Sequence, residues 1–540
     1  MATIQSSEQE SSSGRAPSPQ ATPKPTNNTD AGSKMNLAVV ETKPNPEYVT
    51  GIKLAVIIAT VAFASFLILL DNMIVSTAIP RITDEFHSLG DIGWYASAYQ
   101  FGSAAPQPLT GKIYKYFNTK WTFLAFFGVF EIGSVICGAA VSSPMFIVGR
   151  FIAGFGGAGV ATGTITMVSN SAPLEKRPVL LGLTLGCFYV NLPVGAVAVL
   201  SILVLRIPEP TIKPRALSLL PRLHHYLDLV GFILFAPAVL QLLLALQFGG
   251  RSFPWNSSQI IGLFVGAAAT TIVWFFWNRY RGDDAMMPRT MIRQRSVLFS
   301  ALYNGSQTSA VYAAIYYLPL YFQAVQGASA ILSGVYLLPM ILSQLFLAGA
   351  SGAVVQKIGY VIPVAAFATL FLSIGTGLYS LLQPGTSTGR WIGFQILGGV
   401  GFGAGLQMPI IAVQAAMDGE ELASSIAFMV FSQAIGPAIA NTLYNVIFLE
   451  SLQKEIAHHA PQANVQAIID AGASEFRSIV SPKDINGVLI AYANSLDRIF
   501  YLAAAFAGLC GVFLWGMGWH DLRKKEGDDT EAKAGATDAN

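Results

Sequence analysis

The chain has 540 residues, of which 53% are hydrophobic and only 11% are charged. Soluble proteins carry about 25% charged residues, so this composition excludes a soluble enzyme and predicts a polytopic membrane protein. The 32 basic residues are balanced by 30 acidic ones, which leaves no basic excess for binding nucleic acid. Cys137, Cys187 and Cys510 all lie in apolar segments, so a disulfide scaffold and a cysteine zinc site are excluded.

Apolar segments of about 20 residues follow one another from Leu54 onward, each long enough to cross a membrane as a helix. The fold class predicted is therefore an all-α polytopic membrane protein. We expect about thirteen spans, at 54–78, 93–112, 121–142, 144–168, 184–205, 228–248, 259–278, 297–322, 332–355, 360–382, 391–413, 423–449 and 499–519.

The polar segments divide these spans into regions. Ser-, Pro- and Thr-rich residues 1–50 predict a disordered cytoplasmic tail, and the charged residues 521–540 predict another. Between them we expect an N-terminal helical bundle over 51–206, a basic loop with two linking spans over 207–296, and a C-terminal bundle over 297–520. The last region includes a long outer loop at 450–497, where the sequence allows an amphipathic helix.

Basic residues in the short loops orient the chain, because cytoplasmic loops carry an excess of Lys and Arg. By this rule the cytoplasmic loops are those with Lys112, Lys115 and Lys120, with Lys176 and Arg177, and with the basic clusters at 206–225 and 279–295. Asn256 begins an Asn-Ser-Ser sequon in a loop on the other side, and it is therefore a glycosylation candidate.

The loop charges also reveal a conflict in the N-terminal half. The basic loops at 176–177 and 206–225 both read as cytoplasmic, so an even number of crossings should separate them. The intervening segment 178–205 is too short for two helices of about 20 residues. Either a span is missing from this chain, or the segment is re-entrant, or one basic loop lies on the outer side.

Several runs of residues resemble signatures of the major facilitator superfamily, in particular its fourteen-span drug:proton antiporter branch. They also resemble fungal multidrug and mycotoxin efflux carriers. The runs are Leu70–Pro80 with Asp71, Gly111–Phe117 after the second span, Gly149-Arg150 with the glycines up to Gly159, Phe188–Gly195, and Gly405–Pro409. The resemblance covers about residues 50 to 520 and implies two helical bundles with alternating access between them.

The chain departs from the family pattern at three places. Lys115 stands where the loop motif normally has an acidic residue, and Ala153 stands where the fourth span often has Gln. The Gly-Pro motif of the fifth span is absent between Arg177 and Phe188, at the place where the loop charges indicate too little chain. One lost span added to the thirteen visible ones would give the fourteen expected.

Three charges lie well inside the predicted spans: Asp71, Glu131 and Arg150. Charged residues at membrane depth are costly and are functional by default, so these three are proton-coupling candidates. Asp71 and Arg150 are expected at a similar depth, together with Tyr99 and Gln100. Arg150 has a structural alternative as an anchor for backbone carbonyls, and Glu131 has one as a hydrogen-bonding residue between helices.

The C-terminal half contributes aromatic and amide side chains that suit an amphipathic organic compound. The substrate-cavity candidates are Tyr99, Gln100, Tyr316, Gln344 and Gln407, with Gln395, Gln414 and Gln433 in the same group of amides. Interior amides also join helices without touching a substrate. No Walker loop is found, so no cofactor is expected, and the His458-His459 pair lacks metal-ligand spacing.

These features predict proton-coupled export of a small hydrophobic drug, toxin or secondary metabolite by a monomer in the lipid bilayer, and not an enzyme. Proton-coupled uptake of a nutrient or siderophore is an alternative. A non-transporting or defective product is another, because the fifth span is absent. The plasma membrane is the expected location, with a vacuolar or vesicle membrane as the alternative.

Overall fold

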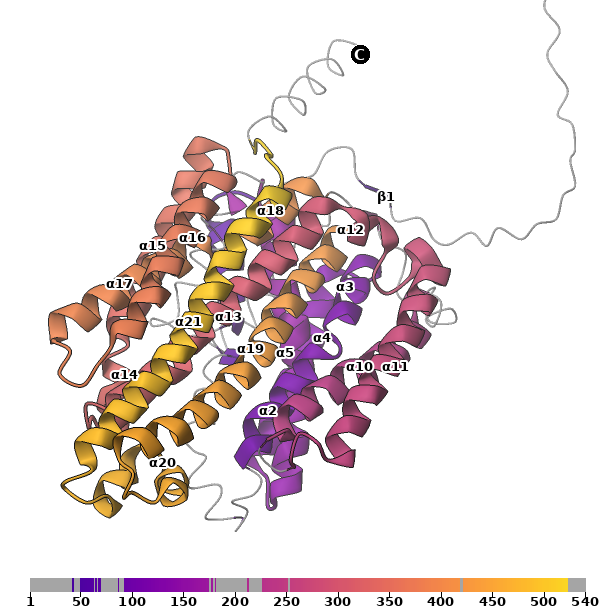
Figure 1. Cartoon of the computed structure of the whole chain (residues 1–540). Coiled ribbons are helices and arrows are strands. Elements are labelled where there is room, and N and C mark those ends of the chain that lie inside the picture. Colours follow the sequence, from indigo (N-terminus) through magenta and orange to yellow (C-terminus); the bar gives the residue numbers. More distant parts are fainter. Residues whose placement is uncertain are drawn as a thin grey trace, which may run out of the picture. The chain divides into compact units, whose positions relative to one another are not determined.

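The computed structural model of the protein is mostly helical over the residues that it describes (Figure 1). It describes residues 41–42, 49–62, 64–65, 67–68, 86, 92–173, 176–177, 180, 211–212, 226–250, 253–417 and 421–522. The two-residue strands β1 (Glu41–Thr42) and β2 (Thr211–Ile212) pair antiparallel. Within the described ranges, nine helices are long and apolar enough to cross a membrane. The short segment 178–205, where we expect a missing span, lies outside the described residues except for Leu180.

In the part of the N-terminal half that the structure describes, an apolar helix over Ile52–Ala62 is followed by four further helices. These are α2 (Ile92–Ala104), α3 (Gln107–Tyr116), α4 (Thr119–Gly138) and α5 (Ser143–Ser171). The span expected at 93–112 is thus two helices separated at Ala105-Pro106. Proline has no N–H to donate and its ring crowds the preceding turn, so the helix breaks there.

Glycines allow the N-terminal helices to pack closely. A Cβ atom at Gly154 on α5 would overlap the backbone carbonyl of Tyr99 on α2, and one at Gly156 would overlap the backbone of Phe130 on α4. Without a hydrophobic driving force in lipid, such close backbone contact is what holds neighbouring spans together. The glycines after Arg150 therefore serve helix packing.

The two linking spans form a hairpin of α10 (Leu229–Phe248) and α11 (Ser258–Arg281). Each begins with a capping side chain, because Asp228 accepts from the amide of Gly231 and Ser257 accepts from that of Ile260. The short helices η4 (Gly282–Asp284) and α12 (Arg289–Arg293) then lead into the C-terminal half.

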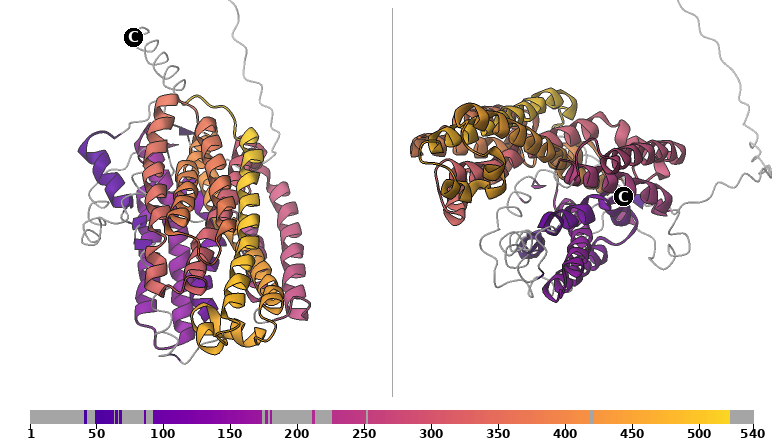
Figure 2. Two further views of the ribbon diagram at one scale, coloured as in Figure 1. Left: turned by 60° about the vertical axis from the view of Figure 1, so that its left-hand side comes forward. Right: turned by 60° about the horizontal axis from the view of Figure 1, so that its bottom comes forward.

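The C-terminal half contains the remaining helices. They are α13 (Arg295–Ala324), α14 (Ala330–Val335), α15 (Leu338–Ile358), α16 (Ile362–Leu378), η5 (Tyr379–Leu381), α17 (Thr388–Gly405), α18 (Met408–Ala416), α19 (Leu422–His459), α20 (Val465–Ile479) and α21 (Ile485–Met517). The spans expected at 332–355 and 391–413 are each broken, and Pro339 and Pro409 lie in the first turn of the second piece. In Figure 2 the purple helices of the N-terminal half group together, as do the orange and yellow helices after residue 295.

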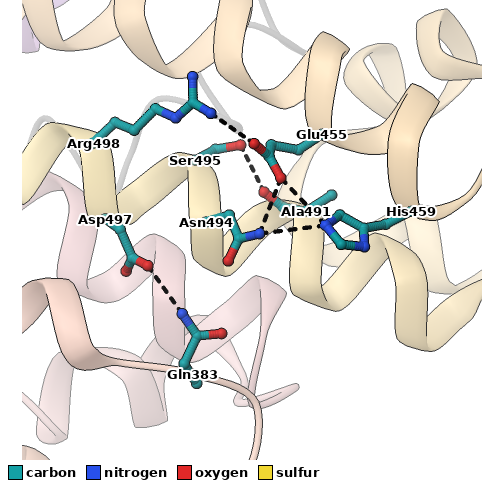
Figure 3. A network of polar contacts seen from close by, with 8 residues as sticks. All are labelled: Gln383, Glu455, His459, Ala491, Asn494, Ser495, Asp497 and Arg498. Carbon is teal, nitrogen blue, oxygen red and sulfur yellow. Dashed lines mark hydrogen bonds and ion pairs between the residues drawn. The ribbon is translucent and has the colours of Figure 1, made fainter.

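Helices α19 and α21 extend well beyond the apolar segments that predicted them. Helix α19 has 38 residues and is therefore roughly 57 Å long, against about 30 Å for a hydrocarbon core. The extensions pair with each other, since Glu455 binds Arg498 at 2.7 Å and accepts from Asn494 at 2.9 Å (Figure 3). The segment expected as an outer loop is thus mostly helical, and α20 is the amphipathic helix within it.

Candidate functional site

Arg150 lies on α5 and is 1% exposed. Its Nε donates to the backbone carbonyl of Tyr95 at 3.1 Å, and its guanidinium carbon lies 4.7 Å from the centre of the Tyr99 ring. Tyr95 is fixed in turn, because its hydroxyl donates to Ser143 at 3.0 Å. A buried cation requires such partners, since an unpaired charge in a low-dielectric interior is very costly. Arg150 is therefore a firmly held positive charge between α5 and α2.

The other N-terminal candidates do not all share this environment. Tyr99 is 6% exposed and faces Arg150, whereas its neighbour Gln100 is exposed. Glu131 is half-buried on α4. Asp71, the expected acidic partner of Arg150, lies outside the described residues. The structure therefore brings together Arg150 and Tyr99 and separates Gln100 from them.

The candidate residues of the C-terminal half also lie in different environments. Tyr316 is 57% exposed, with its ring 5.9 Å from that of Tyr312. Gln344 lies beside a small, partly open hollow between α13, α15, α16 and α17. The hollow is lined mainly by apolar side chains, with Gln344, Thr376 and Tyr379 as its polar members.

Two buried amides outside the lining of this hollow, one on α17 and one just before α18, lack hydrogen bonds. Gln395 and Gln407 are each 1% exposed, and neither the amide nitrogen nor the oxygen of either has a partner in the part of the chain that the structure describes. The Tyr379 hydroxyl is unpartnered as well. Leaving such a group unsatisfied costs about 1–3 kcal/mol, and a bound compound that donates and accepts would remove this cost. Gln407 was predicted as a cavity residue, and Gln395 belongs to the same group of amides.

A salt bridge joins the two halves at the end assigned to the cytoplasm. The Nζ of Lys115 on α3 lies 2.7 Å from Oε1 of Glu421, the residue before α19, and the two side chains are 7% and 21% exposed. Gly111 allows this approach, because a Cβ there would come within 2.7 Å of the backbone of Ser424. A second polar contact between the halves runs from Gln414 Nε2 to Ser169 Oγ at 2.9 Å.

This salt bridge accounts for the unusual lysine of the loop motif. Where an acidic residue is normal at position 115, this chain has a base and supplies the acid from the other half. Sequence reasoning identified Lys115 as a departure from the pattern but missed Glu421. The sequence did contain a hint, because a buried lysine needs an acidic partner and residues 108–120 contain no Asp or Glu.

Comparison of the sequence with protein families gives a result that agrees with the two helical bundles. Residues 61–441 match the profile of the Major Facilitator Superfamily. The chain belongs to this superfamily. The predicted family and fold class are thereby confirmed.

Named relatives cover most of the chain. It is 46% identical over 503 residues to the MFS-type transporter pigP of Monascus ruber, covering 89% of this chain and 88% of that one. It is 42% identical over 525 residues to the efflux pump mlcE of Penicillium citrinum, covering 91% and 94%. Both relatives are named as transport proteins and not as enzymes.

A solved structure supports the fold. The proton:xylose symporter XylE matches with a TM-score of 0.54 at 14% identity, covering 87% of this chain and 98% of that one. At this identity the likeness concerns the fold alone.

Proposed function

We propose that the protein exports a small hydrophobic compound in exchange for protons. The observation that carries this proposal is the 42% identity to a protein named as an efflux pump, over 94% of that protein's length. The buried positive charge of Arg150 supports proton coupling, because a carboxylate beside it can be charged in one state of the cycle and neutral in the other. Asp71 is the proposed carboxylate, and Glu131 is the second candidate.

Substrate recognition is assigned to uncharged side chains of the C-terminal half. Gln344 lines the mainly apolar hollow, and Gln407 and Gln395 are buried amides of the same half. Such groups suit an apolar compound that carries a few oxygen or nitrogen atoms. Tyr99 contributes on the opposite half, beside Arg150.

Alternating access needs contacts that form in one state and break in the other. We assign this role at the cytoplasmic end to the Lys115–Glu421 salt bridge, hereafter the cytoplasmic gate. The 2.7 Å contact between the two charges would correspond to the closed gate. Opening it exposes both charges to water, which offsets part of the lost Coulomb energy.

Transport into inside-out vesicles tests the proposal. The protein is expressed in a yeast strain that lacks its own multidrug pumps, and Nile red is used as the hydrophobic probe. We expect the vesicles to accumulate the dye when their interior is acidic, and a protonophore to abolish this accumulation. Loss of dye from acidic vesicles would indicate proton-coupled uptake by the cell, and movement unaffected by the gradient would contradict proton coupling.

The location and state of assembly are tested separately. We propose a monomer in the plasma membrane, which a fluorescent fusion and the photobleaching steps of single spots can check. Asn256 is exposed in the turn before α11, where we propose a glycan. Asn256→Gln should then increase electrophoretic mobility, as enzymatic deglycosylation of the parent does.

A further inference from the structure

A second buried lysine lies one helical turn from the cytoplasmic gate and has a different partner. Lys112 on α3 is 0% exposed, and its Nζ donates to the backbone carbonyl of Asp284 at 3.1 Å. Asp284 belongs to the turn over 282–288 that follows the linking hairpin, α10–α11. Lys112 therefore connects the N-terminal half to the segment between this hairpin and the C-terminal half.

The 282–288 turn is itself held rigidly by Asp228 at the start of the hairpin. Asp228 is 1% exposed and has a positive φ of 47°. Its carboxylate accepts from Trp277 Nε1 at 2.8 Å and from the backbone amide of Met286 at 2.8 Å. Asn278 adds a bond to the carbonyl of Met287 at 2.9 Å. The carbonyl that receives Lys112 is thus part of a turn with little freedom.

Further contacts join the hairpin to the N-terminal half. The ring of Tyr226, just before Asp228, lies 5.2 Å from that of Tyr116 on α3. At the opposite end of the hairpin, Phe248 lies 5.3 Å from Trp94 on α2. The hairpin also meets the C-terminal half through the rings of Phe235 and Phe431, 5.5 Å apart. That contact is apolar and has no directional bond, whereas the Lys112 hydrogen bond is directional and charge-assisted.

Lys112 and Lys115 are three residues apart on one helix, so their positive charges repel each other. Lys115, Glu421, Asp228 and Asp284 all interact electrostatically with Lys112. A Lys112 released from the Asp284 carbonyl would compete with Lys115 for Glu421. Its attachment to the 282–288 turn leaves the gate carboxylate to Lys115.

We propose that Lys112 is a positioning residue of the cytoplasmic gate, which fastens the linking hairpin to the N-terminal half so that the two move as one body. Opening then separates this body from the C-terminal half at Lys115–Glu421. The inference rests on the proposed function for its alternating access, but its test needs no transported compound.

Distances between spin labels at three exposed positions test this proposal. In a chain whose three native cysteines are replaced by Ser, the labels are placed in pairs at Trp121→Cys on the N-terminal half, Arg279→Cys on the hairpin and Lys357→Cys on the C-terminal half. The closed gate is compared with Glu421→Gln, which removes the charge that holds it. We expect the 121–357 and 279–357 distances to lengthen in Glu421→Gln while the 121–279 distance stays the same.

Variants of Lys112 then address its own role. Lys112→Met in the Glu421→Gln background should broaden the distribution of 121–279 distances and shift it to longer values. Lys112→Arg in the same background should keep the distribution narrow. Asp283→Asn is the matched control, because this exposed acid in the same turn accepts from the backbone amide of Thr290 at the start of α12. Membrane abundance of each variant is checked by fluorescence-detected size exclusion.

Two outcomes would overturn the proposal. A constant 279–357 distance with a changing 121–279 distance would place the hairpin with the C-terminal half. A Lys112→Met distribution as narrow as that of the parent would remove Lys112 from the attachment. Either result leaves the dye-transport test untouched, so a failure here is distinct from a failure of the proposed function.

Discussion

The interiors of the two halves differ in the kind of polar residue they bury. The N-terminal half buries charges, among them Lys112, Lys115 and Arg150, and each has a partner. Among the residues that the structure describes after Arg295, the fully buried polar side chains are uncharged, and several amide atoms lack partners. The carboxylates of Glu421, Glu455 and Asp497 are only partly buried. A buried charge cannot persist unpaired, whereas an unpaired amide costs only about 1–3 kcal/mol and can await a ligand. This difference supports the proposal that proton coupling belongs to one half and recognition of the compound to the other.

The largest expected effect concerns the completeness of the N-terminal half, which has five predicted spans against six in the C-terminal half. We predict that this chain transports poorly, because a missing fifth span would leave the close-packing faces of its neighbours without a partner. Inserting about 30 to 35 residues of a relative's fifth span after Arg177, enough for one crossing and a turn, should restore transport. Dye efflux and membrane abundance of both versions are measured in one host. Equal activity without the insert would mean that residues 178–205 suffice.

The next effect concerns the charge proposed to face Arg150. Asp71→Asn keeps nearly the same shape but cannot lose a proton, so proton-driven efflux should disappear while the protein remains in the membrane. Efflux is measured in vesicles at several interior pH values. Glu131→Gln, treated identically, shows whether the half-buried carboxylate of α4 contributes. Unchanged pH-dependent efflux in Asp71→Asn would remove this residue from the mechanism.

The cytoplasmic gate predicts a reciprocal rescue. Lys115→Glu and Glu421→Lys should each lower the transport rate about tenfold, which corresponds to about 1.4 kcal/mol. This is less than the ~3–5 kcal/mol for breaking a fully buried pair, because Glu421 is partly exposed. The double variant should regain most of the rate by restoring opposite charges. If the free-energy change in the double variant equals the sum of the changes in the two single variants, the two residues are not coupled.

The smallest effect compares one amide from each half. Gln107 in the N-terminal half is bonded to Thr162 at 2.6 Å and to the carbonyl of Ala158, whereas Gln395 has no partner among the described residues. Gln107→Leu should lower the free energy of unfolding by about 1–3 kcal/mol. Gln395→Leu should leave it unchanged or raise it, and should weaken dye binding about two- to tenfold, the value of one hydrogen bond. Thermal midpoints in detergent and dye titrations measure both, and a destabilised Gln395→Leu would show that this amide has a structural bond.

Sequence reasoning predicted the features that follow from hydropathy and charge, and missed those that depend on tertiary contacts. The apolar segments predicted most spans and placed Arg150 within the fourth, because each signal is contained in about 20 consecutive residues. The helix breaks next to Pro106 and Pro409 were overlooked because the hydropathy continues across them. Glu421 lies 306 residues from Lys115, and Asp228 sits at a loop end, so neither could be recognised as a partner before the chain was folded.

The length of α19 and α21 was underestimated for a related reason. Polar residues such as Glu455 and Arg498 end a hydropathy signal, but they do not end a helix. Here they pair across the two helices beyond the apolar core, which stabilises the extra turns. Hydropathy therefore predicted the apolar part of each helix but not the full length of the helix.

The division of labour between the halves is tested most directly by the dependence of initial dye-transport rate on the imposed pH gradient, measured for two variants side by side. Arg150→Lys keeps a positive charge but loses the planar donor group that bonds Tyr95 and faces Tyr99. We predict that Arg150→Lys flattens the gradient dependence and leaves dye affinity unchanged, and that Gln407→Leu weakens dye affinity and leaves the relative gradient dependence unchanged. A gradient dependence that is lost in Gln407→Leu and kept in Arg150→Lys would contradict the account.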